Sequence, residues 1–581
     1  MEKIRFDKLT FTYPLCEEPA LKDISFQINS SEFIVVCGKS GCGKSTLLRH
    51  MKKSMIPYGK QTGQVTYEGR KMEELDDRRS ASEIGFVQQN PDHQIVTDKV
   101  WHELAFGLEN LGLPVKVIKR RVAEMASYFG IQNWFHRDVH QLSGGQKQIV
   151  NLASVMAMQP EVLILDEPTS QLDPIAASDF LQTINRINKD LGTTVIISEH
   201  RLEEVFPMAD RVMVMDQGKI EAFENPAKTG AVLSGGSSGV AHPMFYGLPC
   251  VMRIFQPILS EEEESPITIR EGRMKMEELM EQAHCRIQEE KKEKNRFRER
   301  MNYKKESKRL DGRRRGDKKE AAVFLKDVWF RYGRDLPDIL KGLSFEVRKG
   351  EWYCLLGGNG TGKSTVLKAI CGILKPQRGT VCIDGIQVEK EAEQKLFDHR
   401  LAMVPQNPQA LFTEITAEEE LYEGIRFLDM PEEEKLESVE RMLKLMEITH
   451  LRKANPYDLS GGEQQRLAIG KILLLDPTVL LLDEPTKGLD PFFKRTLAEI
   501  LSKLRDQRVT IFMVSHDLDF CASYGDRCAM FFDGEIVSEA PPADFFPGNH
   551  FYTTTANKIV RKWNPELITC EEVQRWLQEM I

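Results

Sequence analysis

Two glycine-rich stretches of the chain have the residues needed to bind phosphate groups. They read GKSGCGKST from Gly38 to Thr46 and GGNGTGKST from Gly357 to Thr365. In loops of this pattern the backbone N–H groups surround the phosphates, the lysine reaches the β and γ oxygens, and the next hydroxyl binds Mg²⁺. The sequence therefore predicts two nucleotide sites. The predicted phosphate-binding residues are Gly38, Ser40, Gly41, Gly43, Lys44, Ser45 and Thr46 in the first site and Gly357, Asn359, Gly360, Gly362, Lys363, Ser364 and Thr365 in the second.

A pair of adjacent acidic residues follows an apolar strand in each half of the chain. The pairs are Asp166 with Glu167 and Asp483 with Glu484. The aspartate can hold Mg²⁺, while the glutamate orients or deprotonates the attacking water. We therefore expect each glutamate to be catalytic. The predicted metal-site residues are Ser45, Gln89 and Asp166 in the first half and Ser364, Gln406 and Asp483 in the second.

A histidine and a glutamine also recur at matching places. His200 and His516 lie 34 and 33 positions after the two aspartates, which favours a contact with the γ-phosphate over an ordinary hydrogen-bonded polar residue. Gln89 and Gln406 each begin a Gln-Asn-Pro loop, and a glutamine there can sense the metal and the water. All four residues are predicted to be catalytic. The tyrosines that precede the two loops and could stack on adenine are Tyr13 and Tyr332.

A third motif begins with Leu-Ser-Gly-Gly and occurs as LSGGQKQ at Leu142–Gln148 and as LSGGEQQ at Leu459–Gln465. A Ser-Gly-Gly turn that opens a helix offers a hydroxyl and free backbone N–H groups, and the helix dipole adds partial positive charge. Each copy is therefore predicted to bind an anion. A further LSGG at 233–236 is followed by linker residues, and we interpret it as a flexible connector. The predicted anion-binding residues are Ser143, Gly144, Gly145, Ser460, Gly461 and Gly462.

The spacing of these motifs indicates one unit written twice. Gln89 precedes Ser143 by 54 positions, and Gln406 precedes Ser460 by the same 54. Each copy alternates short apolar runs with helical stretches, which is typical of a parallel sheet covered by helices. We therefore expect an α/β fold of two tandem P-loop domains, each with a small C-terminal appendage.

The expected domain boundaries follow from these repeats. We place a first domain at 1–228, an appendage and linker at 229–320, a second domain at 321–545 and an appendage at 546–581. The linker stretch 286–319 carries 16 Lys and Arg against 7 Asp and Glu. We interpret it as a solvated connector, with contact to anionic lipid or to RNA as alternatives.

The two appendages share a capping pattern. The composition, considered separately, indicates a cytoplasmic protein. The segments VMRIFQP and IVRKWNP are each followed by a Thr-x-x-Glu box, Thr268 with Glu271 and Thr569 with Glu572, which predicts a short helix. Neither a membrane-spanning apolar run nor a signal peptide is expected. The 11 cysteines, without a C-x-x-C pair, are expected to be mostly buried thiols.

These motifs together resemble the nucleotide-binding domains of ABC ATPases over about residues 1–225 and 321–545. The resemblance includes the D-loop, as SQLD at Ser170–Asp173 and KGLD at Lys487–Asp490. It implies that ATP and Mg²⁺ are bound and that ATP is hydrolysed. In this family two domains pack head to tail, so the resemblance implies that the signature at 142 caps ATP at Lys363 and that the signature at 459 caps ATP at Lys44.

A narrower resemblance concerns the segment after each Gln-Asn-Pro loop. FVQQNPDHQIVTDKVWHELAFGLEN at Phe86–Asn110 resembles energy-coupling factor importers, which take up vitamins or cobalt and nickel, and Met403–Leu421 is a looser copy. The C-terminal segment Phe551–Trp563 also looks like those of fused ATPases of this group. This implies an integral membrane scaffold (T-type) protein and a substrate-binding membrane protein as partners, at the cytoplasmic face of the membrane. The basic linker fits an alternative, the ribosome-associated ABC-F factors. A sugar-importer type with fused ATPases, or another ABC subfamily, is a further alternative.

Two residues depart from the family pattern. Gln171 replaces the usual alanine or glycine of the first D-loop, and Glu463 replaces the glutamine of the second signature. Neither removes a phosphate ligand, so we expect both sites to hydrolyse ATP. Cys42 lies beside Lys44 at a helix N-terminus, which favours a reactive thiol of lowered pKa, with a small space-filling residue as the alternative.

Overall fold

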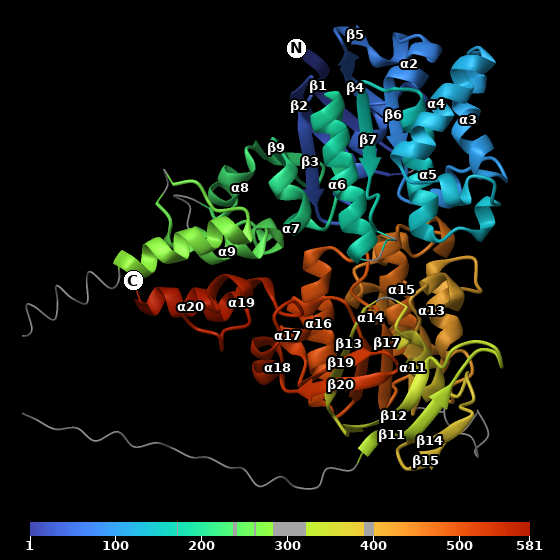
Figure 1. Ribbon diagram of the computed structural model, residues 1–581, viewed down its shortest axis with the longest axis vertical. Coiled ribbons are helices and arrows are strands. Elements are labelled where there is room, and N and C mark those ends of the chain that lie inside the picture. Colours follow the sequence, from blue (N-terminus) through green and yellow to red (C-terminus); the bar gives the residue numbers. More distant parts are fainter. Residues whose placement is uncertain are drawn as a thin grey trace, which may run out of the picture. The chain divides into compact units, whose positions relative to one another are not determined.

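The computed structural model describes residues 1–14, 16–170, 172, 174–235, 241–260, 263–282, 321–358, 360–388 and 400–580. The basic stretch 286–319 and the residues Asn359, Gln171 and Asp173 lie outside the described residues. The chain forms two compact units, Met1–Ile267 with Lys487–Lys494, and Thr268–Thr486 with Arg495–Ile581. Figure 1 shows their elements. The predicted four-part division is finer than these two units and stays a prediction.

The first unit contains a mainly parallel sheet and a separate antiparallel sheet. The strand order is β10-β9-β3-β8-β7-β6 in the former, in which β10 alone runs antiparallel to its neighbour, and β2-β1-β4-β5 in the latter. The strands are β1 (Glu2–Thr12), β2 (Leu21–Asn29), β3 (Phe33–Gly38), β4 (Lys60–Tyr67), β5 (Arg70–Lys71), β6 (Ile84–Val87), β7 (Val162–Asp166), β8 (Thr194–Ser198), β9 (Arg211–Asp216) and β10 (Lys219–Glu224).

The parallel strands form because their residues are apolar on both faces. Every residue of β3, β7 and β8 is buried, as expected for strands covered by helices on one side and by the antiparallel sheet on the other. The helices of this unit are α1 (Lys44–Arg49), α2 (Asp77–Glu83), α3 (Val100–Asn110), α4 (Val115–Tyr128), α5 (Gly144–Ala157), α6 (Pro174–Leu191), α7 (Leu202–Val205), α8 (Pro226–Leu233) and α9 (Cys250–Phe255).

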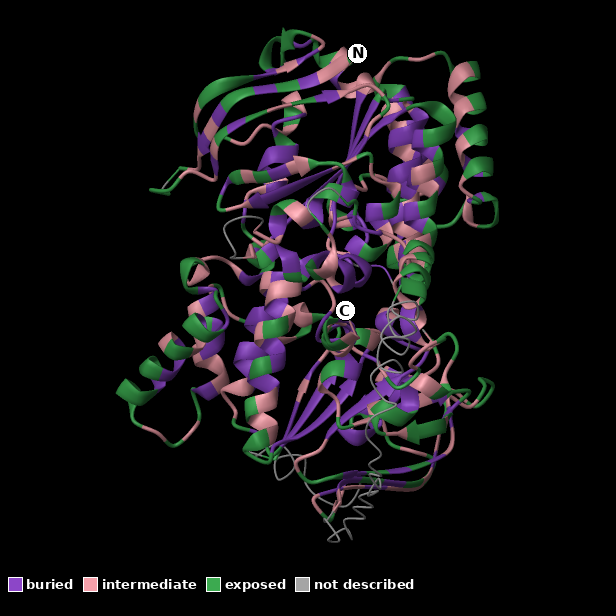
Figure 2. Cartoon of the chain, turned by 90° about the vertical axis from the view of Figure 1, so that its left-hand side faces the viewer, coloured by how far each residue is buried: buried purple, intermediate pink, exposed green. Residues whose placement is uncertain are grey.

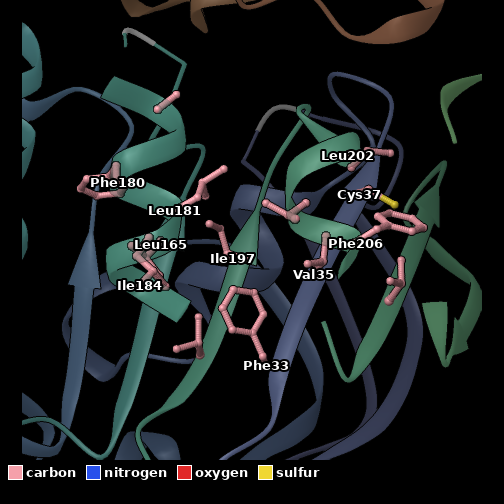
Figure 3. Close-up of a cluster of buried hydrophobic side chains, with 14 of the residues drawn as sticks. Phe33, Val35, Cys37, Leu165, Phe180, Leu181, Ile184, Ile197, Leu202 and Phe206 are labelled. Carbon is pink, nitrogen blue, oxygen red and sulfur yellow. The ribbon is translucent and has the colours of Figure 1, made fainter. Parts of the chain in front are cut away.

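Figure 3 shows how one face of the parallel sheet is packed. Phe180, Leu181 and Ile184 of α6 lie against Leu165 of β7 and Ile197 of β8, and all five are buried. Burying an aliphatic or aromatic side chain of this size contributes about 1.5–3 kcal/mol. The core therefore holds β7 and β8 in place, and with them the acidic residues and the histidine at their carboxyl ends.

The second unit repeats this architecture. Its sheets have the orders β16-β17-β18-β13-β19-β20 and β12-β11-β14-β15. In Figure 2 the central strands of the mainly parallel sheet are buried, whereas the strands of the antiparallel sheet also carry exposed residues. The predicted α/β fold of two tandem P-loop domains is confirmed. The strands are β11 (Ala321–Phe330), β12 (Leu340–Arg348), β13 (Trp352–Leu356), β14 (Arg378–Ile383), β15 (Ile386–Gln387), β16 (Leu401–Val404), β17 (Val479–Asp483), β18 (Thr510–Val514), β19 (Arg527–Phe532) and β20 (Glu535–Ala540).

The helices of the second half complete the repeat and include the C-terminal appendage. Helices α3, α4 and α5 of the first half, which share one apolar cluster, correspond to α13, α14 and α15 here. The helices are α11 (Lys363–Ile370), α13 (Ala417–Ile425), α14 (Glu432–Leu445), α15 (Gly461–Leu473), α16 (Pro491–Asp506), α17 (Leu518–Tyr524), α18 (Pro542–Gly548), α19 (Thr555–Val560) and α20 (Cys570–Met580).

Both predicted Thr-x-x-Glu capping boxes form. The backbone N–H of Glu271 donates to Thr268 Oγ1 at 3.1 Å, and that of Glu572 donates to Thr569 Oγ1 at 3.2 Å. The helix that follows Thr268 belongs to the second unit, where Arg273 Nε donates to the carbonyl oxygen of Lys558 at 2.7 Å. The two appendage segments therefore contact each other within that unit.

The cysteines of the described ranges are free thiols, and most are buried, as expected. Within those same ranges no helix combines the length and the apolar character needed to cross a bilayer.

Candidate functional site

The two glycine-rich loops lie between the first central strand of each unit and the following helix. Gly43 and Gly362, which precede α1 and α11, have φ values of 105° and 108°, a left-handed conformation that glycine adopts without strain. A Cβ atom at Gly38 would lie 2.3 Å from the carbonyl oxygen of Met215, and one at Gly357 would lie 2.4 Å from that of Phe531. The loops therefore require glycine at these positions for steric reasons.

Both loop lysines are buried and fold back over the loop. Lys44 Nζ donates to the carbonyl oxygens of Gly38 and Lys39, each at 3.0 Å. Lys363 Nζ donates to those of Gly357 and Gly358 at 3.1 and 2.8 Å. The ammonium group is thus held in the loop, where phosphate oxygens would replace the carbonyl contacts.

The electrostatic surroundings of the two lysines differ. Burial opposes the charge of Lys44, but interactions with Cys42, Glu167 and further acidic groups outweigh it and raise the pKa of Lys44. Burial lowers the pKa of Lys363, because nearby carboxylates offset it only in part. His516 Nε2 also lies 3.1 Å from Lys363 Nζ.

The first predicted metal site brings together a hydroxyl and a carboxylate. Ser45 Oγ donates to Asp166 Oδ1 at 3.0 Å, and Ser198 Oγ donates to the same oxygen at 2.8 Å. Such oxygen donors fit Mg²⁺, which is bound by one or two carboxylates together with phosphate oxygens. A bound Mg²⁺ would neutralise charge on the phosphates. In the second half, Asp483 ends β17 and Ser364 lies in the first turn of α11, the equivalent places.

Glu167 lies at the centre of a group of site residues in the first half. His200 Nε2 is 2.9 Å from Glu167 Oε1, and Gln89 Nε2 donates to Glu167 Oε2 at 2.8 Å. Burial opposes ionisation, but His200 and Lys44 outweigh it and lower the pKa of Glu167 to about 2. Its φ of 43° is unusual for a residue other than glycine. Such strain is typical of functional positions.

The second half repeats this arrangement in part. His516 Nε2 lies 3.1 Å from Glu484 Oε1, and Glu484 has a φ of 54°. Gln406, in contrast to Gln89, is exposed on its loop after β16. The glutamate and the histidine are therefore in contact in both halves, whereas the loop glutamine joins them only in the first half.

Each signature segment opens a helix through a capping box. The Ser143 N–H donates to Gln146 Oε1 at 3.0 Å, and the Gln146 N–H donates to Ser143 Oγ at 3.3 Å. Ser460 and Glu463 form the same pair of bonds, at 2.9 and 3.4 Å. The departure at Glu463 thus preserves the cap. Gly144 and Gly145 begin α5, and Gly461 and Gly462 begin α15.

The tyrosines lie against their phosphate loops. Tyr13 Oη is 3.0 Å from Thr46 Oγ1, and Tyr332 Oη is 3.2 Å from Thr365 Oγ1. Tyr332 is 56% exposed, so its ring is accessible to a base. Ser40 and Gly41 lie in the first loop and Gly360 in the second, while Asn359 is outside the described residues. Stacking on adenine stays a prediction for both tyrosines.

One further contact in the structure joins the second D-loop to the first phosphate loop. Within the first unit, the Ser40 N–H donates to Asp490 Oδ2 at 3.3 Å, and Lys39 Nζ lies 4.7 Å from the Phe492 ring centroid. Asp490 is the last residue of the KGLD motif, and this motif is the sequence feature that could have pointed to Asp490 as a site residue. This D-loop therefore contacts the first phosphate loop.

The expectation for Cys42 is wrong. Its side chain is 5% exposed, and burial raises the pKa of the thiol despite the opposing effect of Lys44. Desolvation of the thiolate is larger than its attraction to the lysine. Cys42 therefore fits the alternative, a small residue that fills space in the loop.

Known proteins resemble this chain over nearly its whole length. The family model described as ABC transporter matches residues 21–170 and 340–487. A protein of Bacillus thuringiensis, provisionally described as an ABC transporter ATP-binding protein, is 42% identical over 98% of this chain and 97% of its own. A protein of Methanosarcina acetivorans with the same description is 32% identical over 94% of this chain and 86% of its own.

Among solved structures, CbiO1 of Clostridium perfringens, described as part of the ABC transporter complex CbiONQ, is 28% identical with a TM-score of 0.37, over 45% of this chain and 100% of that one. The family match and the full-length relatives agree with two ATP- and Mg²⁺-binding domains that hydrolyse ATP. This chain belongs to the ATP-binding proteins of the ABC transporter family.

Proposed function

We propose that this chain is the ATPase subunit of an energy-coupling factor importer and powers uptake of a vitamin or a transition metal through separate membrane proteins. The observation that carries the proposal is the sequence of the segment after Gln89, which resembles that group of importers and forms helix α3. The chain supplies two sets of ATPase residues, and a transporter that needs two ATPase domains would need one copy of it.

We further propose that each ATP binds between the two halves. The signature at Ser143 would contact ATP held by Lys363, and the signature at Ser460 would contact ATP held by Lys44. Each signature serine caps a helix whose N-terminal N–H groups favour an anion. Because these contacts require the γ-phosphate, ATP would draw the halves together and hydrolysis would release them.

The helices that follow the two glutamine loops would transmit this movement to the membrane partners. Around α3, Val96 is 67% and Trp101 41% exposed, and around α13, Ile415 is 73% and Phe427 87% exposed. Isolated exposed apolar residues are common, but aromatic residues are enriched at interfaces. We assign these two surfaces to unlike cytoplasmic helices of one T-type scaffold, which would place the chain peripherally at the cytoplasmic face of the membrane. A substrate-binding membrane protein would complete the complex.

The neighbouring helices differ in charge, which supports two unlike docking partners. Helix α4 contains four Lys and Arg and one Glu, whereas α14 contains five Glu and three Lys and Arg. A partner helix whose charge is complementary to α4 or to α14 would bind one half in preference to the other, which favours one orientation of the partner. Each half would then accept a different helix of the scaffold.

Purification of the tagged chain from gently solubilised cells tests the proposal. Small integral membrane proteins should accompany the wild-type chain, and they should be lost when Trp101 and Phe427 are changed to Asp. The same experiment with 286–319 replaced by a neutral linker tests the ABC-F alternative, in which this basic stretch would bind RNA with strong salt dependence. Ribosomal particles that co-purify with the wild-type chain and are lost from the linker variant would contradict the importer proposal.

A further inference from the structure

A buried glutamate holds the segment between the glutamine loop and the next helix in both halves. Glu103 Oε2 accepts hydrogen bonds from the backbone N–H groups of Val96 and Thr97 at 3.1 and 2.8 Å. Glu420 Oε2 accepts from those of Thr413 and Glu414 at 2.9 and 2.8 Å. Each glutamate lies 14 positions after its loop glutamine.

The first half links this loop to the signature helix through two amide side chains and through an ion pair, in which Lys147 Nζ of α5 lies 2.5 Å from Asp92 Oδ1 of the loop. Gln148 Nε2 of α5 donates to the carbonyl oxygen of Gln88 at 3.2 Å, and Asn151 Nδ2 donates to that of Pro91 at 3.2 Å. Asn151 is fully buried. Helix α5 therefore contacts the backbone on both sides of Gln89.

The second half keeps a link at the positions of that ion pair, where Gln409 Nε2 donates to Gln464 Oε1 at 3.3 Å, and it has in addition a buried ammonium group at a different position. Lys471 of α15 contacts Glu420 Oε1, lies 2.7 Å from Glu423 Oε2 and donates to the carbonyl oxygen of Leu411 at 2.9 Å. The residue is 8% exposed. One side chain thus joins the loop, α13 and α15.

The internal repeat shows that the two halves make this link with side chains at different positions. The halves are offset by 317 positions, the separation of Ser143 from Ser460. Ala468 occupies the position of Asn151 and cannot donate a side-chain hydrogen bond, while Lys471 occupies that of Ser154. The hydroxyl of Ser154 donates to Asn151 O in its own helix, at 2.9 Å.

A second paired difference accompanies the lysine. Glu423 stands where the first half has Phe106, so the lysine and its additional carboxylate occur together. The helix contact itself is kept, since a Cβ at Gly424 would lie 3.2 Å from Lys471 Cγ and one at Gly107 would lie 3.0 Å from Met158 Sδ. Both glycines therefore face the signature helix closely, although Met158 and Lys471 are not equivalent positions of the repeat, and the polar link at Asn151 and Lys471 differs between the halves.

The ammonium group is charged in this environment. Burial opposes its charge, but hydrogen bonds and charge interactions with Glu420 and Glu423 outweigh it and raise the pKa of Lys471. A buried ion pair of this kind is worth little compared with an apolar replacement, but it defines one arrangement of the groups that it joins.

We propose that Lys471 is a positioning residue for ATP hydrolysis, which holds the Gln406 loop to the signature helix α15. It replaces the link that Asn151 provides in the first half. Through α15 it connects the position of Gln406 to that of Ser460 at the start of the same helix. The inference concerns the ATPase reaction and does not depend on the substrate that is transported.

The test uses the full chain with Lys471→Ser and reads the loop directly. Amide hydrogen exchange of residues 407–416 should accelerate, while that of 90–99 stays unchanged. The kcat for ATP should fall by about tenfold, the lower range for loss of a residue that orients ligands. The KM for ATP should change by less than about twofold, because the phosphate contacts are intact.

Two further variants separate positioning from a general loss of stability. Ala468→Asn added to Lys471→Ser rebuilds the amide link of the first half, and it should restore both kcat and slow exchange. If the single variant folds poorly, the double variant still tests the proposal. Ser154→Ala is the matched control in the first half and should change neither quantity. Unchanged exchange at 407–416 in a folded Lys471→Ser chain, or a failure of Ala468→Asn to restore it, would overturn the proposal.

Discussion

Replacing Glu167 by glutamine removes a carboxylate that touches three other site residues. The change keeps the shape of the side chain and its capacity to accept a hydrogen bond from Gln89, whose Nε2 lies 2.8 Å from Glu167 Oε2 in the wild-type chain. It removes the charge that lies beside His200 at 2.9 Å and Lys44 at 3.9 Å. We expect ATP binding to survive, because the glycine-rich loop and its lysine are untouched.

The size of the effect follows from the pKa of the carboxylate. A general base contributes about 10²–10⁴-fold, and its efficiency is greatest when its pKa lies near the working pH. Burial opposes ionisation of Glu167, but His200 and Lys44 lower its pKa to about 2, so it is a weak base at neutral pH. We therefore expect the lower end, about 10²-fold in kcat or ~2.7 kcal/mol in activation free energy.

Phosphate release at saturating Mg-ATP measures this effect, and a fluorescent nucleotide measures binding separately. Glu124→Gln, on the exposed surface of α4, is the matched control and should have wild-type turnover. Glu484→Gln should reduce turnover in the same way if both halves are active. Turnover near that of the wild type in either site variant would refute the reasoning for that half and assign it a regulatory role.

Three further changes test the core, the loop and the signature. Leu165→Ala, at a fully buried position of β7, should reduce the free energy of unfolding by about 2–5 kcal/mol in denaturant titrations, and an unchanged midpoint would contradict the packing described. Cys42 should react with an alkylating agent far more slowly than the exposed Cys16, as followed by mass spectrometry of peptides, and equal rates would refute its burial. Glu463→Gln should leave thermal stability unchanged because glutamine forms the same capping box, whereas Glu463→Ala should cost about 1 kcal/mol, and equal melting temperatures for the two variants would argue against the cap.

Several features could be predicted because their chemistry depends on residues that are close in the chain. The glycine-rich loops, the Ser-Gly-Gly caps and the Thr-x-x-Glu boxes each form within a few residues of backbone, so composition and spacing suffice. The alternation of apolar runs and helical stretches likewise predicted the α/β fold, since strands buried on both faces must be continuously apolar.

Other features depend on which distant segments the fold brings together and on how much water it excludes. The sequence by itself determined the candidates Glu167, His200 and Gln89, but only the tertiary structure joined them, and it left Gln406 exposed. Local reasoning about Cys42 failed because desolvation, a property of the packed core, outweighed a neighbouring charge. The contacts of Lys471, 51 and 60 positions from Glu420 and Leu411, exist only because α15 packs against α13 and its loop. Spacing along the chain specifies the chemical groups, whereas burial and long-range packing decide their partners and their charge.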